Sequence, residues 1–142
     1  MEVVMALAVL GTMGAGCYVG FNSLNTYAVS SRLFSEAQTC AQNQIDLILS
    51  RGPFNIGQNK IPAELALGTT TKPNVFIYTD PVSGTVVVTG TMTTTITDTN
   101  ATMTFAGITS NLNVRKANIT VAYSFRGKDY SVSMDTLRTA DQ

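Results

Sequence analysis

The chain has 142 residues, enough for one domain, or one domain with an appendage. Nine basic and nine acidic residues cancel, so no net charge favours nucleic acid as a partner. The chain has no histidine, which removes the commonest general base and the commonest metal ligand. No paired carboxylates, phosphate-binding loop or cysteine–histidine cluster stands out in the sequence. We therefore expect a protein that is not an enzyme and has no metal site and no cofactor.

The first predicted element is a helix over residues 1–50. A single acid, Glu2, precedes an uncharged run from Val3 to Phe21, and no proline occurs before Pro53. A helix of this length measures roughly 70 Å, because each residue adds about 1.5 Å. It is too long to be buried inside a globule of this size. We expect it to project into a membrane, a filament, or both.

Residues 1–21 form the apolar part of this helix, long enough to span a bilayer, for which about 20 residues are needed. They do not resemble a secretory signal, because no basic region precedes them and the helical pattern continues beyond them. The large side chains expected in a filament core are Val3, Val4, Met5, Leu7, Val9, Leu10, Met13 and Phe21. The run also contains four glycines, which allow two readings: close packing between helices, or a helix soft enough to unwind locally. They are Gly11, Gly14, Gly16 and Gly20.

Residues 22–50 change to an amphipathic pattern with apolar positions three and four residues apart. This scaffold segment is expected to pack against the following domain along its lower half. The sequence Arg51-Gly52-Pro53 predicts the end of the helix. The predicted stripe comprises Leu24, Ala28, Ser31, Phe34, Ala37 or Gln38, Ala41, Ile45 and Ile48.

The rest of the chain, residues 51–142, is predicted to be an antiparallel β domain that starts with a loop over residues 51–74. A short helical turn is expected at residues 62–67, with proline at its first position. From Asn74 onward the pattern has a period of two, which is typical of strands. Strands are expected at 75–79, 85–97, 102–108, 112–125 and from 130 to about 139, with turns at 80–84, 98–100 and 126–129. The predicted fold class is α+β, a long N-terminal helix packed against a small antiparallel sheet of about four strands.

Two cysteines and two glycosylation sequons are the remaining candidate sites. Cys17 and Cys40 would lie roughly 35 Å apart on one helix, so no disulfide between them is expected. Asn100 and Asn118 each begin an Asn-x-Thr sequon, and Asn100 is the better acceptor because it falls in a predicted turn. Asp98 and Asn100 alone provide too few oxygen ligands for calcium.

Four basic residues near the final hairpin give a mildly basic end, for which solvation is the simplest interpretation. They are Arg115, Lys116, Arg126 and Lys128.

The segment Met1-Glu2-Val3-Val4-Met5-Ala6-Leu7-Ala8-Val9-Leu10 resembles the mature start of type IV pilins and type II secretion pseudopilins. In that family an aromatic residue, threonine, leucine and a variable residue precede a glutamate and an apolar helix, around the N-terminal methylation motif. MEVVMALAVL is similar to this pattern from the variable residue onward. The resemblance extends to the layout of the whole chain, a helix of about fifty residues, a loop and an antiparallel sheet. It departs at Asn22, where many pilins carry a proline.

The resemblance implies that Glu2 sets the axial register of assembly by pairing with the N-terminal ammonium of a neighbouring subunit. An unpaired carboxylate in an apolar bundle costs at least ~2.5 kcal/mol near the membrane centre, and such pairing would relieve that cost. The alternative is an acid that only favours the positive end of the helix dipole.

Three functions follow as expectations. The first is a structural subunit of a type IV pilus-like filament, and the second is a minor pseudopilin of a secretion machine. The third is a bitopic membrane protein that never polymerises and carries an extracytoplasmic binding domain. For the first, the implied partners are identical subunits in a helical polymer, the inner-membrane assembly machinery, and the membrane before assembly. The implied location is the inner membrane and then the cell surface.

Overall fold

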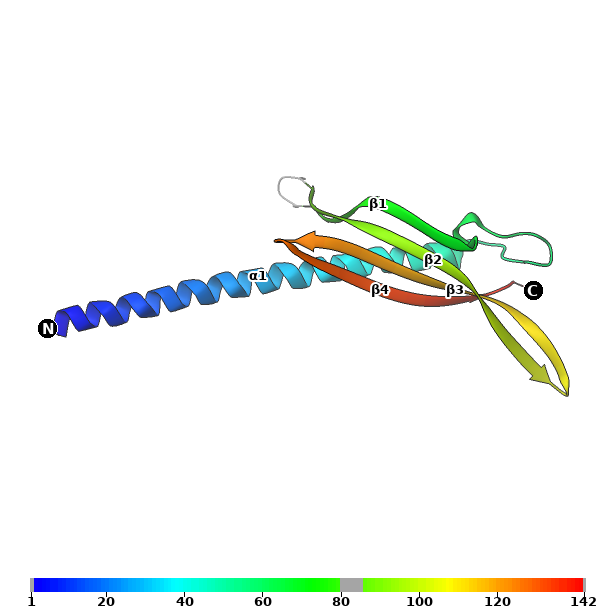
Figure 1. Ribbon diagram of the computed structural model, residues 1–142, viewed down its shortest axis with the longest axis horizontal. Helices are drawn as coiled ribbons and strands as arrows, with labels where there is room; N and C mark the ends of the chain where they lie inside the picture. The colour runs from blue at the N-terminus through cyan, green and yellow to red at the C-terminus, as the bar shows by residue number, and fades with distance from the viewer. Residues whose placement is uncertain (1, 80–85, 142) are drawn as a thin grey trace. The chain divides into compact units, whose positions relative to one another are not determined.

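The computed structural model describes residues 2–79 and 86–141, and for residues 86, 87, 100, 105 and 108–110 it describes the backbone alone. Helix α1 (Glu2–Ser50) is followed by a short 3-10 helix, η1 (Ala63–Leu65). Four strands then follow, as labelled in Figure 1, and their bounds are β1 (Gly68–Thr79), β2 (Val86–Phe105), β3 (Ile108–Phe125) and β4 (Lys128–Thr139). The chain forms two compact units, Met1–Phe34 and Ser35–Gln142, and α1 runs through both.

Helix α1 has the bounds that the sequence predicts. It begins at Glu2 and ends at Ser50, directly before Arg51-Gly52-Pro53. The four glycines between Gly11 and Gly20 do not interrupt it. The first unit is therefore a single continuous helix, and the predicted long N-terminal element is confirmed.

The four strands form one antiparallel sheet in the order β1-β2-β3-β4. Each strand pairs with the next along the chain, so the sheet is the predicted meander. Together with α1 this gives an α+β arrangement, consistent with the pilin-like description. Tight hairpin turns join β2 to β3 and β3 to β4, and their central residues have positive φ: 51° and 81° at Ala106 and Gly107, 51° and 73° at Arg126 and Gly127. These values match type I′ turns, whose twist suits a two-residue hairpin.

The strand boundaries differ from the prediction in four places. Strand β4 begins at Lys128, inside the predicted turn over 126–129. The predicted loop over 51–74 ends earlier, because β1 already begins at Gly68. The predicted turn at 98–100 is wrong, because β2 runs without a break to Phe105. The predicted strand 102–108 is therefore the end of β2 and the turn beyond it, and β3 begins at Ile108 instead of Leu112. The predicted turn at 80–84 lies outside the described residues.

Cross-strand partners explain these differences. Thr69 in β1 lies opposite Thr95 in β2, and their hydroxyl oxygens are 3.1 Å apart. Asp98 lies opposite Arg115 in β3 and accepts a hydrogen bond of 3.2 Å from its Nε. Partners so distant in the sequence override the local turn preference of Asp and Thr-rich segments.

The core of the second unit lies between one face of the sheet and the last turns of α1 (Figure 1). The helix contributes Ala37, Ala41, Ile45 and Ile48, all buried, which confirms the lower half of the predicted stripe. Ala37 rather than Gln38 is the buried alternative, whereas Phe34 is 46% exposed. The sheet contributes alternate residues of each strand, as expected for a sheet with one covered face. These include Ile77, Met92, Ile96, Ile119, Val121 and Val132.

The end of α1 is held by residues from the far end of the chain. Arg138 Nη1 donates hydrogen bonds to the carbonyl oxygens of Ile48 (2.6 Å) and Leu49 (2.8 Å). Asp141 Oδ2 accepts a hydrogen bond from the backbone N–H of Phe54 (2.7 Å), and the Asp141 N–H donates to the Phe54 carbonyl (2.7 Å). The last carbonyls of a helix have no partner within it, so Arg138 supplies donors that α1 lacks.

Candidate functional site

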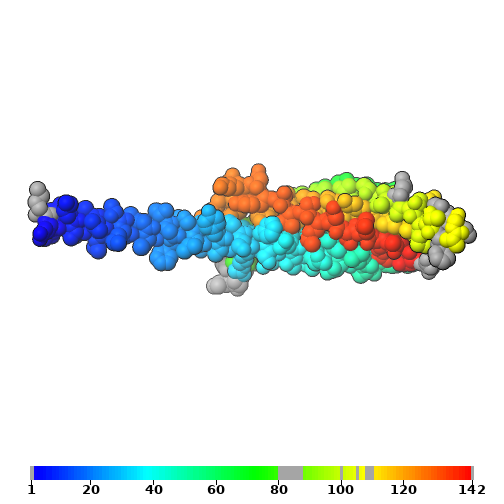
Figure 2. Space-filling view, turned by 90° about the horizontal axis from the view of Figure 1, so that it is seen from below, coloured from blue at the N-terminus to red at the C-terminus, as the bar shows by residue number. Residues whose placement is uncertain are grey.

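The candidate functional site is the uncovered apolar surface of the first unit. From Val3 to Phe21 every residue of α1 is exposed, and Figure 2 shows these side chains standing out along the blue part of the chain. Exposed fractions of the large apolar side chains range from 57% at Val9 to 74% at Tyr18. Exposed large side chains continue past the predicted run to Leu24 and Tyr27. Soluble monomers rarely expose a contiguous apolar patch of this extent, so this surface requires a cover.

The length and composition of α1 fit a hydrocarbon layer. Among the described residues, α1 is the one helix that is long and apolar enough to cross a membrane. At about 1.5 Å per residue, residues 3–21 span roughly 28 Å, close to the ~30 Å of a bilayer core. Tyr18, Phe21 and Tyr27 lie toward one end of this span, where aromatic side chains suit a membrane–water interface.

Two threonine hydroxyls of the first unit are satisfied within the helix. Thr12 Oγ1 donates a 2.9 Å hydrogen bond to the carbonyl of Val9, one turn earlier. Thr26 Oγ1 makes the same kind of bond, 2.9 Å long, to the carbonyl of Asn22. A hydroxyl that bonds to its own helix needs no water, so these threonines fit an apolar surrounding.

Glu2 is the only ionisable carboxylate of the predicted span. It lies in the first turn of α1 and its side chain is exposed. From this position a carboxylate can interact with the positive end of the helix dipole or with a cation on another molecule.

The four glycines of the run widen the choice of packing partners. A Cβ added at Gly11, Gly14, Gly16 or Gly20 would meet no atom within 4 Å. No contact inside the described chain therefore requires glycine at these positions. Their small size leaves room for the close approach of another helix.

The two sequons differ in what the structure describes. The side chain of Asn100 lies outside the described residues; its backbone belongs to β2 rather than to the predicted turn. Asn118 lies in β3, where its Nδ2 donates to Ser133 Oγ (3.0 Å) and to Asp135 Oδ1 (2.6 Å). Its amide nitrogen is thus engaged with β4.

Cys17 is an exposed free thiol and Cys40 a half-buried one. Among the described residues, no group of three or more potential metal-ligating side chains comes together.

Arg115 is a residue whose role the sequence did not reveal. Predicted to be solvated, it is only 5% exposed, and this interpretation is wrong. Its Nε bonds to Asp98, its Nη1 donates to the Leu65 carbonyl, and its guanidinium carbon lies 5.4 Å from the centroid of the Phe54 ring. These three partners lie 17, 50 and 61 positions away, so no local pattern points to them. Arg115 attaches the loop after α1 to the sheet.

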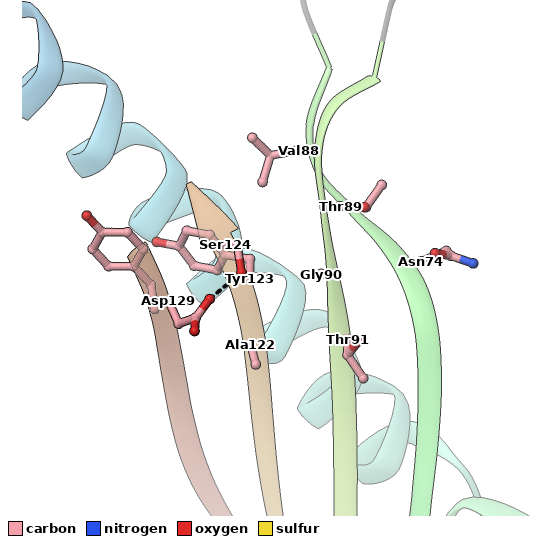
Figure 3. Close-up of a pocket in the computed structure, with 10 residues that line it drawn as sticks. Asn74, Val88, Thr89, Gly90, Thr91, Ala122, Tyr123, Ser124 and Asp129 are labelled. Carbon is pink, nitrogen blue, oxygen red and sulfur yellow. Dashed lines mark hydrogen bonds between the residues drawn. The ribbon is translucent and has the colours of Figure 1, made fainter. Parts of the chain in front are cut away.

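A hollow of about 500 Å³ opens at the end of the sheet where β3 turns into β4 (Figure 3). Its lining includes Gly90 and Ala122, and Ser124 Oγ donates a hydrogen bond to Asp129. The rings of Tyr123 and Tyr130 stack beside it with centroids 5.4 Å apart. Ser124 and Asp129 are also register partners next to the turn, so their bond serves the hairpin. The described lining residues contain one carboxylate and no cation, and they do not form an acid–base pair.

Comparisons of this chain with protein-family models, with characterised proteins and with solved structures found no match.

Proposed function

We propose that this protein is a structural subunit of a type IV pilus-like filament that polymerises through the apolar part of α1. The observation that carries the proposal is the continuous, uncharged and exposed helix surface of Val3–Phe21, preceded by the single acid Glu2. A membrane before assembly and a bundle of equivalent helices afterwards would each cover this surface. The second unit would then face outward from the filament.

Burial of apolar area drives this assembly. Each Å² of apolar surface removed from water contributes about 25 cal/mol, so covering the large side chains of residues 3–21 amounts to tens of kcal/mol before entropy is subtracted. Without such a cover, the full chain is not expected to remain a soluble monomer. The glycines permit the close helix contacts that a filament core needs.

Glu2 supplies the specificity that apolar burial lacks. Apolar surfaces can slide along one another with little change in free energy. A carboxylate held in an apolar bundle is stable only where a cation meets it, and the N-terminal ammonium of a neighbouring subunit is such a cation. One charge pair per subunit would therefore fix the axial register of the polymer.

Replacement of Glu2 tests this proposal. The Glu2→Ala variant is expected to reach the membrane but to lose incorporation into filaments, measured as the amount of this chain in sheared surface filaments. Glu36→Ala is the matched control, because Glu36 is an exposed acid on the same helix outside the apolar run. Wild-type filament yield from Glu2→Ala would contradict the register role.

The two alternatives predict other outcomes for the wild-type chain. A minor pseudopilin would be a trace component of filaments whose main band is another protein. A bitopic protein that does not polymerise would be recovered only in detergent extracts, with no filament.

A further inference from the structure

Strands β2 and β3 extend well beyond their neighbours. Pairing between β1 and β2 ends at Gly68↔Ile96, and pairing between β3 and β4 ends at Val114↔Thr139. Between β2 and β3, however, pairing continues to Phe105↔Ile108. Residues 101–105 and 108–112 therefore form a two-stranded ribbon, drawn in yellow-green and yellow in Figure 1, past the ends of the other two strands. We call this segment the ribbon.

Hydrogen-bonded and non-hydrogen-bonded residue pairs alternate along the ribbon, and this alternation shows which backbone groups point outward. In a type I′ hairpin the residues flanking the turn form a hydrogen-bonded pair, and such pairs then alternate along the ladder. Phe105↔Ile108, Met103↔Ser110 and Ala101↔Leu112 are thus bonded within the ribbon. Thr102 and Asn111 consequently direct their backbone N–H and C=O groups to the outer edges. This alternation is confirmed at Asn113, two residues from Asn111, whose carbonyl accepts the Ala140 N–H at 2.9 Å.

These outer edges lack the features that usually prevent strand addition. Residues 99–113 contain no charged residue and no proline. By contrast, β1 carries Lys72 and Pro73, and β4 carries Lys128, Asp129, Asp135 and Arg138. Charges and proline on an edge strand discourage pairing with another chain. Among the described strands, the edges of the ribbon are the unpaired edges that carry neither a charged residue nor a proline.

The ribbon would also gain stability from a further strand. An isolated two-stranded ribbon is at best marginally stable in water, whereas three or more strands support one another. Met103 and Leu112 are 54% and 38% exposed on it. Strand addition would cover part of this apolar surface and satisfy the outward backbone groups.

We propose that the ribbon pairs with the ribbon of a second copy of this chain, the β3 edge of one copy with the β2 edge of the next. The inference rests on the proposed filament, in which neighbouring copies point the same way. Strand directions then alternate across the junction, so the new pair is antiparallel. Because the two edges differ, the contact is heterologous. A heterologous contact that does not close into a ring repeats in an open series, which is the symmetry that a filament requires.

Site-directed cross-linking tests this pairing. Ribbons side by side at equal height place Asn111 of one copy opposite Thr102 of the next. Thr102→Cys and Asn111→Cys variants, each with Cys17→Ser and Cys40→Ser, are expressed separately and together. A short bis-maleimide joins thiols that lie close together. Its reach should also allow the two strands to be displaced by two residues, which is roughly 7 Å along a strand. Linked dimers are expected from cells with both variants, and only traces from either variant alone.

The outcomes separate this pairing from the filament itself when filaments are counted in the same cells. Filaments without a mixed dimer would overturn the ribbon pairing and leave the proposed function standing. A mixed dimer without filaments would support the pairing and remove the proposed function. Equal dimer from Thr102→Cys alone would overturn the heterologous arrangement, because it requires two β2 edges to meet.

A proline variant measures what the pairing contributes. Thr102→Pro removes an outward N–H and leaves the bonds inside the ribbon, whereas Thr102→Ala retains that N–H and serves as the control. Loss of one hydrogen bond at each junction is expected to weaken subunit association roughly three- to ten-fold, measured by the dissociation of sheared filaments in detergent. Equal dissociation of the two variants would contradict the pairing.

Discussion

Arg115 attaches the loop after α1 to the sheet. It is buried, and Asp98, the Leu65 carbonyl and the Phe54 ring compensate its charge. Sequence pattern could not distinguish it from its neighbour Lys116, since both lie in the same strand and both are basic. The two residues differ in burial. Arg115 is buried because Phe54 and Leu65, which are distant in the sequence, lie against it in the folded chain.

The Arg115→Ala variant is expected to lower the free energy of unfolding by about 2–4 kcal/mol, because it leaves a buried carbonyl and a carboxylate without their donor. Urea unfolding of the full chain in detergent, followed by the near-ultraviolet circular dichroism of its tyrosines, measures this. Lys116→Ala is the matched control: its pair with Asp135 is on the surface, and about 1 kcal/mol or less is expected. Equal losses from both variants would contradict the role of Arg115.

Asp135 is expected to make the stability of the sheet depend on pH. A hydrogen bond from Asn118, and then the nearby Lys116 ammonium, lower the pKa of Asp135 below its ordinary value of 3.8. A lowered pKa stabilises the fold above the ordinary value, and this contribution disappears as the pH falls through the lowered value. Unfolding midpoints in urea between pH 5 and pH 2 are expected to fall more steeply for the wild-type chain than for Asp135→Asn. Identical slopes would show that the carboxylate is not coupled to folding.

Among the elements, α1 was predictable at both ends, whereas β1, β3 and β4 were predictable only at their C-terminal ends. The uncharged run and the Arg-Gly-Pro stop are local signals, and the helix begins and ends where they predict. The start of β1 and the unbroken course of β2 depend on partners across the sheet, such as Thr95 for Thr69 and Arg115 for Asp98. A single sequence does not show these partners, so turn-forming residues suggested a turn within β2.

The apolar surface of the candidate site was predictable for a similar reason: it is one continuous stretch of sequence. Its extension to Leu24 and Tyr27 was not predicted. The pattern there is amphipathic, and it does not reveal which of its apolar side chains stay exposed.

The C-terminal cap of α1 is expected to depend on Arg138. Arg138→Ala removes two donors from the Ile48 and Leu49 carbonyls and is expected to cost about 1–3 kcal/mol in the same urea measurement. Arg138→Lys is expected to recover only part of this loss, because an ammonium keeps the charge without the planar fork. Full recovery by lysine would show that charge alone, and not the geometry of the guanidinium, holds the helix end.

At the scale of the whole molecule, the two units differ in how far their apolar side chains are buried. The second unit has its own core between the sheet and residues 35–50 of α1, whereas residues 3–21 of the first unit are exposed throughout. The chain is thus a folded domain joined to an exposed apolar helix. In the proposed filament, packing between equivalent helices would cover residues 3–21 and leave the core of the second unit unchanged.

Electron microscopy of sheared surface filaments, with mass spectrometry of their main band and helical reconstruction, tests this proposal most directly. We predict that the main band is this chain and that residues 3–21 of α1 pack together in the filament core. A main band formed by another protein, or recovery of this chain only in detergent extracts without filaments, would contradict it.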